Sequence, residues 1–229
     1  MKLVSNFQKR LTDYSRTDSI GSRFRTKRAA ALVRLIEEEA ARSGQVRIID
    51  LGGERNYWNI IPADFLRRHR VHITLVNKAK HATPPDDELF AFIDGDACNL
   101  ASLDSMSFGI VHSNSVIEHV GDWQRMVAFA GEVRRLAPHY FVQTPHFWFP
   151  LEPHFMAPFF HWLPETVRAS LLMRFELGTW PRATSASEAM AWVQTARLLD
   201  RKLFTALFCD ANVTTERLLG LPKSLIAVK

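Results

Sequence analysis

The stretch VRIIDLGGERNYW at residues 46–58 joins an apolar run to two consecutive glycines. Its first six residues are mostly apolar, as in a strand that is buried on both faces of a parallel sheet. Gly52 and Gly53 follow this strand directly, and Asp50 and Glu54 place a carboxylate on either side of them. Glycines at such a position let the backbone approach a bound ligand closely. The stretch therefore predicts a strand followed by a ligand-binding turn.

The composition fits a single globular domain spanning residues 1–229. Hydrophobic residues make up 47% of the chain and charged residues 23%, which suits a sizeable buried core. No apolar run reaches the roughly 18 to 20 residues of a membrane helix, and the first residues lack the apolar centre of a signal peptide. We therefore expect a cytoplasmic protein without a transmembrane segment. Cys98 and Cys209 form no metal-binding pair, so we expect two buried free thiols.

The net charge of +5 is concentrated near the N-terminus. Residues 1–47 contain 11 Lys and Arg against 5 Asp and Glu, and the remainder is nearly balanced. A basic segment can contact nucleic acid, but no nucleic-acid-binding module accompanies this one. We interpret residues 1–45 as a helical cover over the ligand cleft and expect no nucleic-acid partner.

Apolar strands alternate with amphipathic helices along most of the chain. Strands are expected at residues 46–51, 71–77, 89–97, 108–114 and 139–145, and two more surround a Gly-Leu-Pro turn within residues 212–229. Helices are expected at residues 25–44, 56–69, 122–137 and 185–199, the last with Ser187 as its N-cap. This alternation predicts a doubly wound α/β fold with a mostly parallel seven-stranded sheet and an antiparallel C-terminal strand.

Polar residues follow the predicted strands, at the edge where ligands bind in parallel sheets. They are Asp50, Asn77, Asp96, Asn114, Ser115 and Thr144. A dinucleotide-binding turn requires G-x-G-x-x-G, but counting from Gly52 this chain has Glu54 and Tyr57 at the other two positions. Glu54 would also oppose a phosphate. A ligand with a cationic centre and no phosphate suits the turn better.

Several segments together resemble class I S-adenosylmethionine-dependent methyltransferases, of the type 11 small-molecule group. The segments are IIDLGG, GDA at residues 95–97, FGIVHSNSVIEHV at residues 108–120 and GLPKSLIAV near the C-terminus. The resemblance runs from about residue 46 to the end of the chain. It departs from the family pattern at Glu54 and Gly109, and at Asn77, where an acidic residue is usual.

The resemblance implies a Rossmann-like methyltransferase fold, S-adenosylmethionine as the cofactor and a set of cofactor-binding residues. These residues are Asp50, Gly52, Gly53, Asn77, Asp96, Ala97, Asn114 and Ser115. Turn formation is an alternative role for Asn77 and for Asp96. The implied activity is methyl transfer to an O, N or C nucleophile of a small molecule. The alternatives are a non-catalytic binding protein with this fold and, less favoured, an NAD-dependent oxidoreductase.

Histidines supply the candidate bases if the acceptor is a hydroxyl. His119, His146 and His154 are these candidates, and structural hydrogen bonding is the alternative for each. The histidines and Glu152 match no zinc-binding spacing, so we expect no metal. Residues 146–185 are rich in aromatic residues and are interpreted as an insertion that lines the acceptor site. An acceptor with apolar area, such as a lipid-linked molecule, and a second hydrophobic core are equally compatible with this segment.

Overall fold

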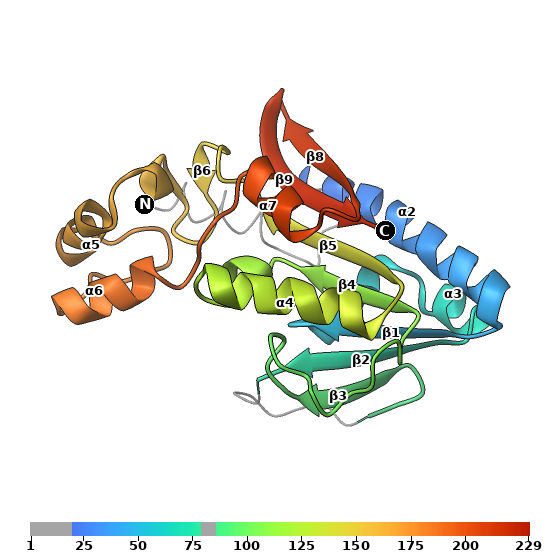
Figure 1. Cartoon of the computed structure of the whole chain (residues 1–229). Helices are drawn as coiled ribbons and strands as arrows, with labels where there is room; N and C mark the ends of the chain where they lie inside the picture. Colours follow the sequence, from blue (N-terminus) through green and yellow to red (C-terminus); the bar gives the residue numbers. More distant parts are fainter. Residues whose placement is uncertain (1–19, 79–85) are drawn as a thin grey trace. The chain divides into compact units, whose positions relative to one another are not determined.

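The computed structural model describes residues 20–78 and 86–229, and side chains from Arg28 onward (Figure 1). Residues 1–19 of the predicted N-terminal cover therefore lie outside the described residues. Its remaining part is helix α2 (Ile20–Ser43), which ends where predicted: Gly44 has a φ of 75° and donates its N–H to the carbonyl of Ala40 at 2.9 Å. None of the described helices is long and apolar enough to cross a membrane.

The main sheet has seven strands in the order β3-β2-β1-β4-β5-β9-β8. Strands β1 (Val46–Leu51), β2 (Val71–Asn77), β3 (Phe90–Asp94) and β4 (Ile110–Asn114) pair in parallel. In this register Asp50 lies opposite Leu75 on one side and His112 on the other. Strand β5 spans His139–Pro145, the predicted range. The predicted seven-stranded α/β sheet is confirmed.

The C-terminal strands give the sheet its antiparallel edge. Tyr140 and Lys229 exchange both of their backbone hydrogen bonds, at 3.2 and 3.1 Å, which is the antiparallel pattern. Strands β8 (Asn212–Leu218) and β9 (Leu221–Val228) form a hairpin. Its two turn residues are Leu219 and Gly220, with φ of 51° and 81°, so the turn lies one residue earlier than predicted.

The predicted helix at residues 56–69 is wrong as a single element. A 3-10 helix, η1 (Arg55–Ile60), is followed by the short helix α3 (Ala63–Arg68). Pro62 lies between them and lacks a backbone N–H, and Ile61 before it adopts extended dihedrals, as the residue before proline usually does. The helix predicted at residues 122–137 is confirmed as α4 (Trp123–Leu136).

The second half of the chain contains short elements that the sequence analysis did not predict. They are a small hairpin of β6 (Leu151–Glu152) and β7 (Ala157–Pro158), η3 (Phe160–Trp162), α5 (Glu165–Arg174) and α7 (Arg201–Leu207). A 3-10 turn, η2 (Ile117–His119), follows β4, where a helical turn was expected. Helix α6 (Ala186–Val193) corresponds to the predicted helix at residues 185–199. Its N-cap is Ser185 rather than Ser187, since the Ser185 hydroxyl accepts the N–H of Glu188.

The chain divides into two compact units, and each is described by itself. Unit 1 contains residues up to 114, 128–142 and 228–229; unit 2 contains residues 115–127 and 143–227. Whether residues 1–229 act as one domain stays a prediction. Cys98 in unit 1 is buried as expected, whereas Cys209 in unit 2 is exposed, which corrects the prediction.

Each unit has a hydrophobic core of its own. In unit 1, buried aliphatic side chains of β1, β2 and β4, such as Ile48, Ile73 and Ile110, are 0% exposed. In unit 2, the aromatic segment supplies Phe155 and Phe160, which pack with residues of α5 and α6. Part of the aromatic segment is thus a second core, while Trp148, Phe159 and Trp162 remain exposed.

Candidate functional site

In unit 1, Asp50 is the centre of a buried hydrogen-bond network beneath the glycine turn. Its side chain is fully buried at the end of β1. One carboxylate oxygen accepts the indole N–H of Trp58 at 2.9 Å, and the other accepts from Nδ1 of His112 at 2.7 Å. Both oxygens thus have protein partners. Asp50 therefore has a structural role as the acceptor for Trp58 and His112. Direct contact between Asp50 and a ligand stays a prediction.

The two glycines are required for different reasons. Gly52 has a φ of 73°, in the left-handed region that favours glycine, and donates its N–H to the carbonyl of Val76 at 2.7 Å. At Gly53 a Cβ atom would lie 1.9 Å from Oδ2 of Asp50. The side chain of Asp50, rather than a ligand alone, therefore excludes any larger residue at position 53.

We expect Gly53→Ala to lower the free energy of unfolding by about 1 to 3 kcal/mol, because the methyl group overpacks the buried Asp50 site. Gly131→Ala is the matched control: it lies within α4, and a Cβ there meets nothing within 4 Å. The control should be neutral or stabilise by up to about 1 kcal/mol. Denaturant unfolding of both variants tests this, and equal stability of the two would contradict it.

Tyr57 fills the position that a third glycine would take in a dinucleotide-binding turn. It is buried in η1, and its ring packs against His112 with ring centroids 4.7 Å apart. The other nitrogen of His112, Nε2, is buried and has no hydrogen-bond partner among the described residues. Aromatic rings therefore pack against the glycine turn. In a pyrophosphate site the third glycine lets the following helix pack closely against the strand, and Tyr57 prevents this here.

The predicted ligand residues after β2 and β3 are close to each other in unit 1. The side-chain oxygen of Asn77 accepts the N–H of Lys78 at 2.9 Å, and that of Asp96 accepts the N–H of Cys98 at 3.0 Å. Lys78 Nζ also lies 3.4 Å from Asp96. Asp96 thus takes part in a turn, which was its alternative role, whereas Asn77 is the last residue of β2. The ligand roles of Asn77, Asp96 and the half-buried Ala97 stay predictions.

Residues at the end of β4 are held by partners within their own units. Asn114 accepts a 3.1 Å hydrogen bond from the guanidinium of Arg28 on α2, in unit 1. Ser115, in unit 2, has a φ of 57°, a rare conformation for a residue other than glycine. Its N–H and hydroxyl bond to the carbonyl and side chain of Gln143, at 2.9 and 3.1 Å. Such local strain occurs often at functional sites.

Gly109, which departs from the family pattern, has a packing explanation within unit 1. A Cβ at this position would lie 2.5 Å from Oε1 of Glu39 on α2. Glu39 is buried and pairs with Arg42 at 2.6 Å. The carboxylate of Glu39 therefore occupies the space into which an aspartate at position 109 would project.

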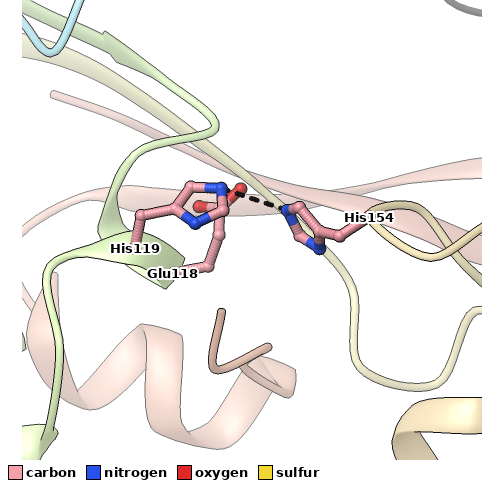
Figure 2. Close-up of side chains that lie close together, drawn as sticks. All are labelled: Glu118, His119 and His154. Atoms are coloured by element: carbon pink, nitrogen blue, oxygen red, sulfur yellow. Dashed lines mark hydrogen bonds between the residues drawn. The ribbon is translucent and has the colours of Figure 1, made fainter. Parts of the chain in front are cut away.

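In unit 2, Glu118, His119 and His154 form a cluster (Figure 2). Nε2 of His119 lies 3.1 Å from Nε2 of His154, and each of the three residues offers a ligand atom within 4.8 Å of the others. Two of the three predicted bases, His119 and His154, are thus brought together although they are 35 positions apart. We call these three residues the His-Glu cluster.

The opposite ring nitrogens of the two histidines are anchored. Nδ1 of His119 donates to the backbone carbonyl of Thr195 at 2.8 Å. Nδ1 of His154 donates to the carboxylate of Glu152 at 2.7 Å, and Glu152 in turn accepts the N–H of Phe155. These bonds fix the orientation of both rings and direct their Nε2 atoms toward each other.

Glu118 is the buried member of the His-Glu cluster. It is 1% exposed in η2, and one carboxylate oxygen accepts the hydroxyl of Thr144 at 2.9 Å. The other oxygen, Oε1, has no hydrogen-bond partner among the described residues. Burial raises the pKa of Glu118 above its ordinary value, although the nearby His119 and His154 oppose this shift. A cation beside Oε1 would stabilise the charged form.

The pKa of His154 is raised above its ordinary value of 6.5. Burial lowers it, but the hydrogen bond that His154 donates to Glu152 and the charges of Glu152 and Glu118 together outweigh burial. Protonated His154 therefore stabilises the folded state fully below about pH 6.5, and this contribution is lost as the pH rises through the folded pKa.

We expect the stability difference between the wild type and His154→Gln to be larger at about pH 6 than at about pH 9. Denaturant unfolding in the presence of a chelator measures it. His72→Gln, at an exposed position of β2, is the control and should show no such trend. A difference that grows with rising pH would contradict the assignment.

The third predicted base, His146, has other partners. It is buried, and its ring nitrogen Nδ1 accepts the backbone N–H of Trp148 at 3.0 Å. The backbone N–H of His146 donates to the carbonyl of Lys223. Burial lowers its pKa below the ordinary value, and the same holds for His161, whose Nε2 bonds to the carbonyl of Phe147. The geometry favours His119 and His154 over His146 as groups that act on a ligand.

The sequence analysis did not assign roles to Glu118, Glu152 or Thr195 in this cluster. The pairs Glu118-His119 and Glu152-x-His154 were visible as local patterns. The contact between these two pairs depends on the path of the chain between residues 119 and 152.

No protein-family model and no curated protein matches the sequence. Solved structures give distant likenesses. An O-methyltransferase family protein from Burkholderia thailandensis is 13% identical with a TM-score of 0.48, over 88% of this chain and 56% of that chain. An S-adenosylmethionine-dependent methyltransferase from Methanosarcina mazei is 13% identical with a TM-score of 0.49, over 80% and 91%. A Rhodobacter sphaeroides protein named for Zn-dependent alcohol dehydrogenases is 10% identical with a TM-score of 0.49, over 89% and 96%. At this distance, neither an activity nor a substrate follows for this chain.

Proposed function

We propose that the protein transfers a methyl group from S-adenosylmethionine to a small-molecule acceptor. The order of the strands carries this proposal. A classic dinucleotide-binding sheet has the order 3-2-1-4-5-6, whereas here the last strand of the chain, β9, lies between β5 and β8. This antiparallel insertion is the feature by which the methyltransferase fold differs from that of dehydrogenases, and it matches the resemblance found in the sequence.

The residues of unit 1 suit this cofactor better than a dinucleotide. Tyr57 fills the position of the third glycine, and Glu54 beside the turn is exposed and acidic. Carboxylates near the loop oppose a pyrophosphate but attract the sulfonium and ammonium groups of S-adenosylmethionine. These carboxylates are thus compatible with a cationic ligand. The same residues disfavour the NAD-dependent alternative.

We assign the cofactor to the strand ends of the predicted site. The backbone of Gly52 and Gly53 would approach the amino acid part, Asn77 the ribose and Asp96 the adenine amino group, with Ala97, Asn114, Ser115 and Asp50 lining or supporting the site. The bound cofactor supplies an electrophilic methyl group. The chain has to hold the nucleophile in line with it and exclude water.

The acceptor is proposed to be a small molecule that reacts through O, N or C. A hydroxyl acceptor must lose its proton, and the His-Glu cluster offers two imidazoles and a carboxylate for this step. Exposed aromatic rings of unit 2 suit an acceptor with apolar area: Trp148 and Phe159 pack against Trp162, with ring centroids 6.0 and 5.0 Å apart.

Calorimetry on Asp96→Ala tests the cofactor assignment. The variant should bind S-adenosylhomocysteine more weakly by about 1 to 3 kcal/mol, the range for hydrogen bonds to a charged group. Asp64→Ala is the control, because Asp64 is 91% exposed on α3. Unchanged affinity in a folded Asp96→Ala variant would return Asp96 to a purely turn-forming role. Binding without transfer, in a screen of acceptors with labelled cofactor, would favour the non-catalytic alternative.

A further inference from the structure

The two facing nitrogens of the His-Glu cluster cannot be explained by neutral histidines alone. The carbonyl of Thr195 can only accept a hydrogen bond, so Nδ1 of His119 carries a proton. The carboxylate of Glu152 fixes a proton on Nδ1 of His154 in the same way. In the neutral rings both Nε2 atoms then present lone pairs, yet they lie 3.1 Å apart. A cation resolves this repulsion, either as a proton on Nε2 of His154 or as a metal ion bound to both nitrogens, and Glu118 favours the metal ion.

We propose that Glu118, His119 and His154 bind a divalent transition-metal ion of the zinc class. Zinc–nitrogen bonds of about 2.0 to 2.1 Å at a tetrahedral ion place two imidazole nitrogens about 3.3 Å apart. The observed Nε2 separation of 3.1 Å is close to this value. The proposal departs from the expectation, drawn from local sequence spacing, that the protein has no metal site.

Glu118 supplies the third protein ligand of the proposed site. Its Oε1 is buried and has no hydrogen-bond partner among the described residues. One of its carboxylate oxygens lies within 4.8 Å of a ring nitrogen of each histidine. An unpaired buried carboxylate oxygen is costly unless a cation or donor meets it.

The surrounding hydrogen bonds are those of a metal site. Histidine ligands usually donate their second N–H to a carboxylate or a backbone carbonyl, and here Glu152 and Thr195 take these two roles. Thr144 holds the carboxylate of Glu118. Two imidazoles and one carboxylate suit Zn²⁺, Co²⁺ or Fe²⁺ rather than Mg²⁺, which prefers oxygen ligands.

Three protein ligands leave a coordination position for an outside molecule. His119 is exposed, so the ion is accessible. An oxygen donor, such as a hydroxyl or carboxylate of a small molecule, is the expected ligand at that position, and the metal would lower the pKa of a bound hydroxyl. The inference depends on the residues of unit 2 alone and stands whether or not the proposed methyl transfer is correct.

Titration of the metal-free full-length protein with Co²⁺ and Zn²⁺ tests the proposal. The wild type should bind one equivalent, with visible Co²⁺ absorption typical of a low-coordinate site and, for Zn²⁺, an X-ray absorption spectrum showing two imidazoles. His119→Ala and His154→Ala should abolish this binding, whereas His72→Ala, at an exposed position in unit 1, should not. Wild-type protein without stoichiometric binding, or a bound ion without two imidazoles, would overturn the proposal even if the variants unfold.

Glu152→Gln gives a milder test of the same site. It weakens the acceptor that orients His154, so the metal affinity should fall roughly 10- to 100-fold with the fold retained. Glu176→Gln, at an exposed position of unit 2, is the matched control. Equal affinities of the two variants would contradict a metal ligated by His154.

Discussion

Asp50→Ala is expected to lower the free energy of unfolding by about 4 kcal/mol. The substitution leaves two buried donors, Nε1 of Trp58 and Nδ1 of His112, without their acceptor. Each such orphan costs about 1 to 3 kcal/mol. His112 is 1% exposed, so water cannot easily replace the lost bond. Denaturant unfolding of Asp50→Ala beside the exposed control Asp64→Ala measures the effect, and a loss below about 1 kcal/mol would refute the network's role.

A double-mutant cycle separates this network from a general loss of packing. In the Asp50→Ala background the carboxylate that conflicts with a Cβ at position 53 is gone. Gly53→Ala should therefore cost much less there than in the wild type, with a coupling of about 1 kcal/mol or more. Additive effects of the two substitutions would contradict the close approach of Asp50 to Gly53.

His154→Ala is expected to reduce turnover at least about 100-fold, the lower end for removing a group that transfers a proton. His119→Ala should have a similar effect, since the two Nε2 atoms face each other in the His-Glu cluster. His146→Ala is the matched comparison: its Nδ1 is engaged by Trp148, so the variant should retain turnover within a few-fold while losing stability. Initial rates with an acceptor found by screening, together with melting temperatures, measure these effects.

The cofactor affinity of the same variants shows what any loss of turnover means. A role in the reaction requires that S-adenosylhomocysteine binding and melting temperature of His154→Ala remain near the wild type while turnover falls. Normal turnover of both His119→Ala and His154→Ala, or a loss that follows unfolding, would make the cluster structural.

The strands were predictable because their apolar runs are long enough to be read locally. Strands β1, β2 and β5 have their predicted bounds. The helix at residues 56–69 failed at Pro62, where a missing N–H outweighed the apolar periodicity. The hairpin turn was misplaced by one residue, since Leu219 adopts a positive φ that its side chain does not favour.

The sequence supplied candidate residues for the site but not their partners. His119 and His154 were candidates from the sequence, yet their contact depends on a chain path of 35 residues, which local spacing does not encode. Gly109 likewise looked like a departure from the family until Glu39, 70 positions earlier, was found against it. Contacts between distant segments follow from tertiary packing, and these contacts decide which histidine nitrogens face each other.

Calorimetric titration of the wild-type protein with S-adenosylmethionine, S-adenosylhomocysteine and NAD⁺ tests the proposed cofactor. We expect one-to-one binding of the methyl donor and its demethylated product, and no binding of NAD⁺, because Tyr57 and Glu54 disfavour a pyrophosphate. Binding of NAD⁺ without binding of the methyl donor would contradict the proposed function.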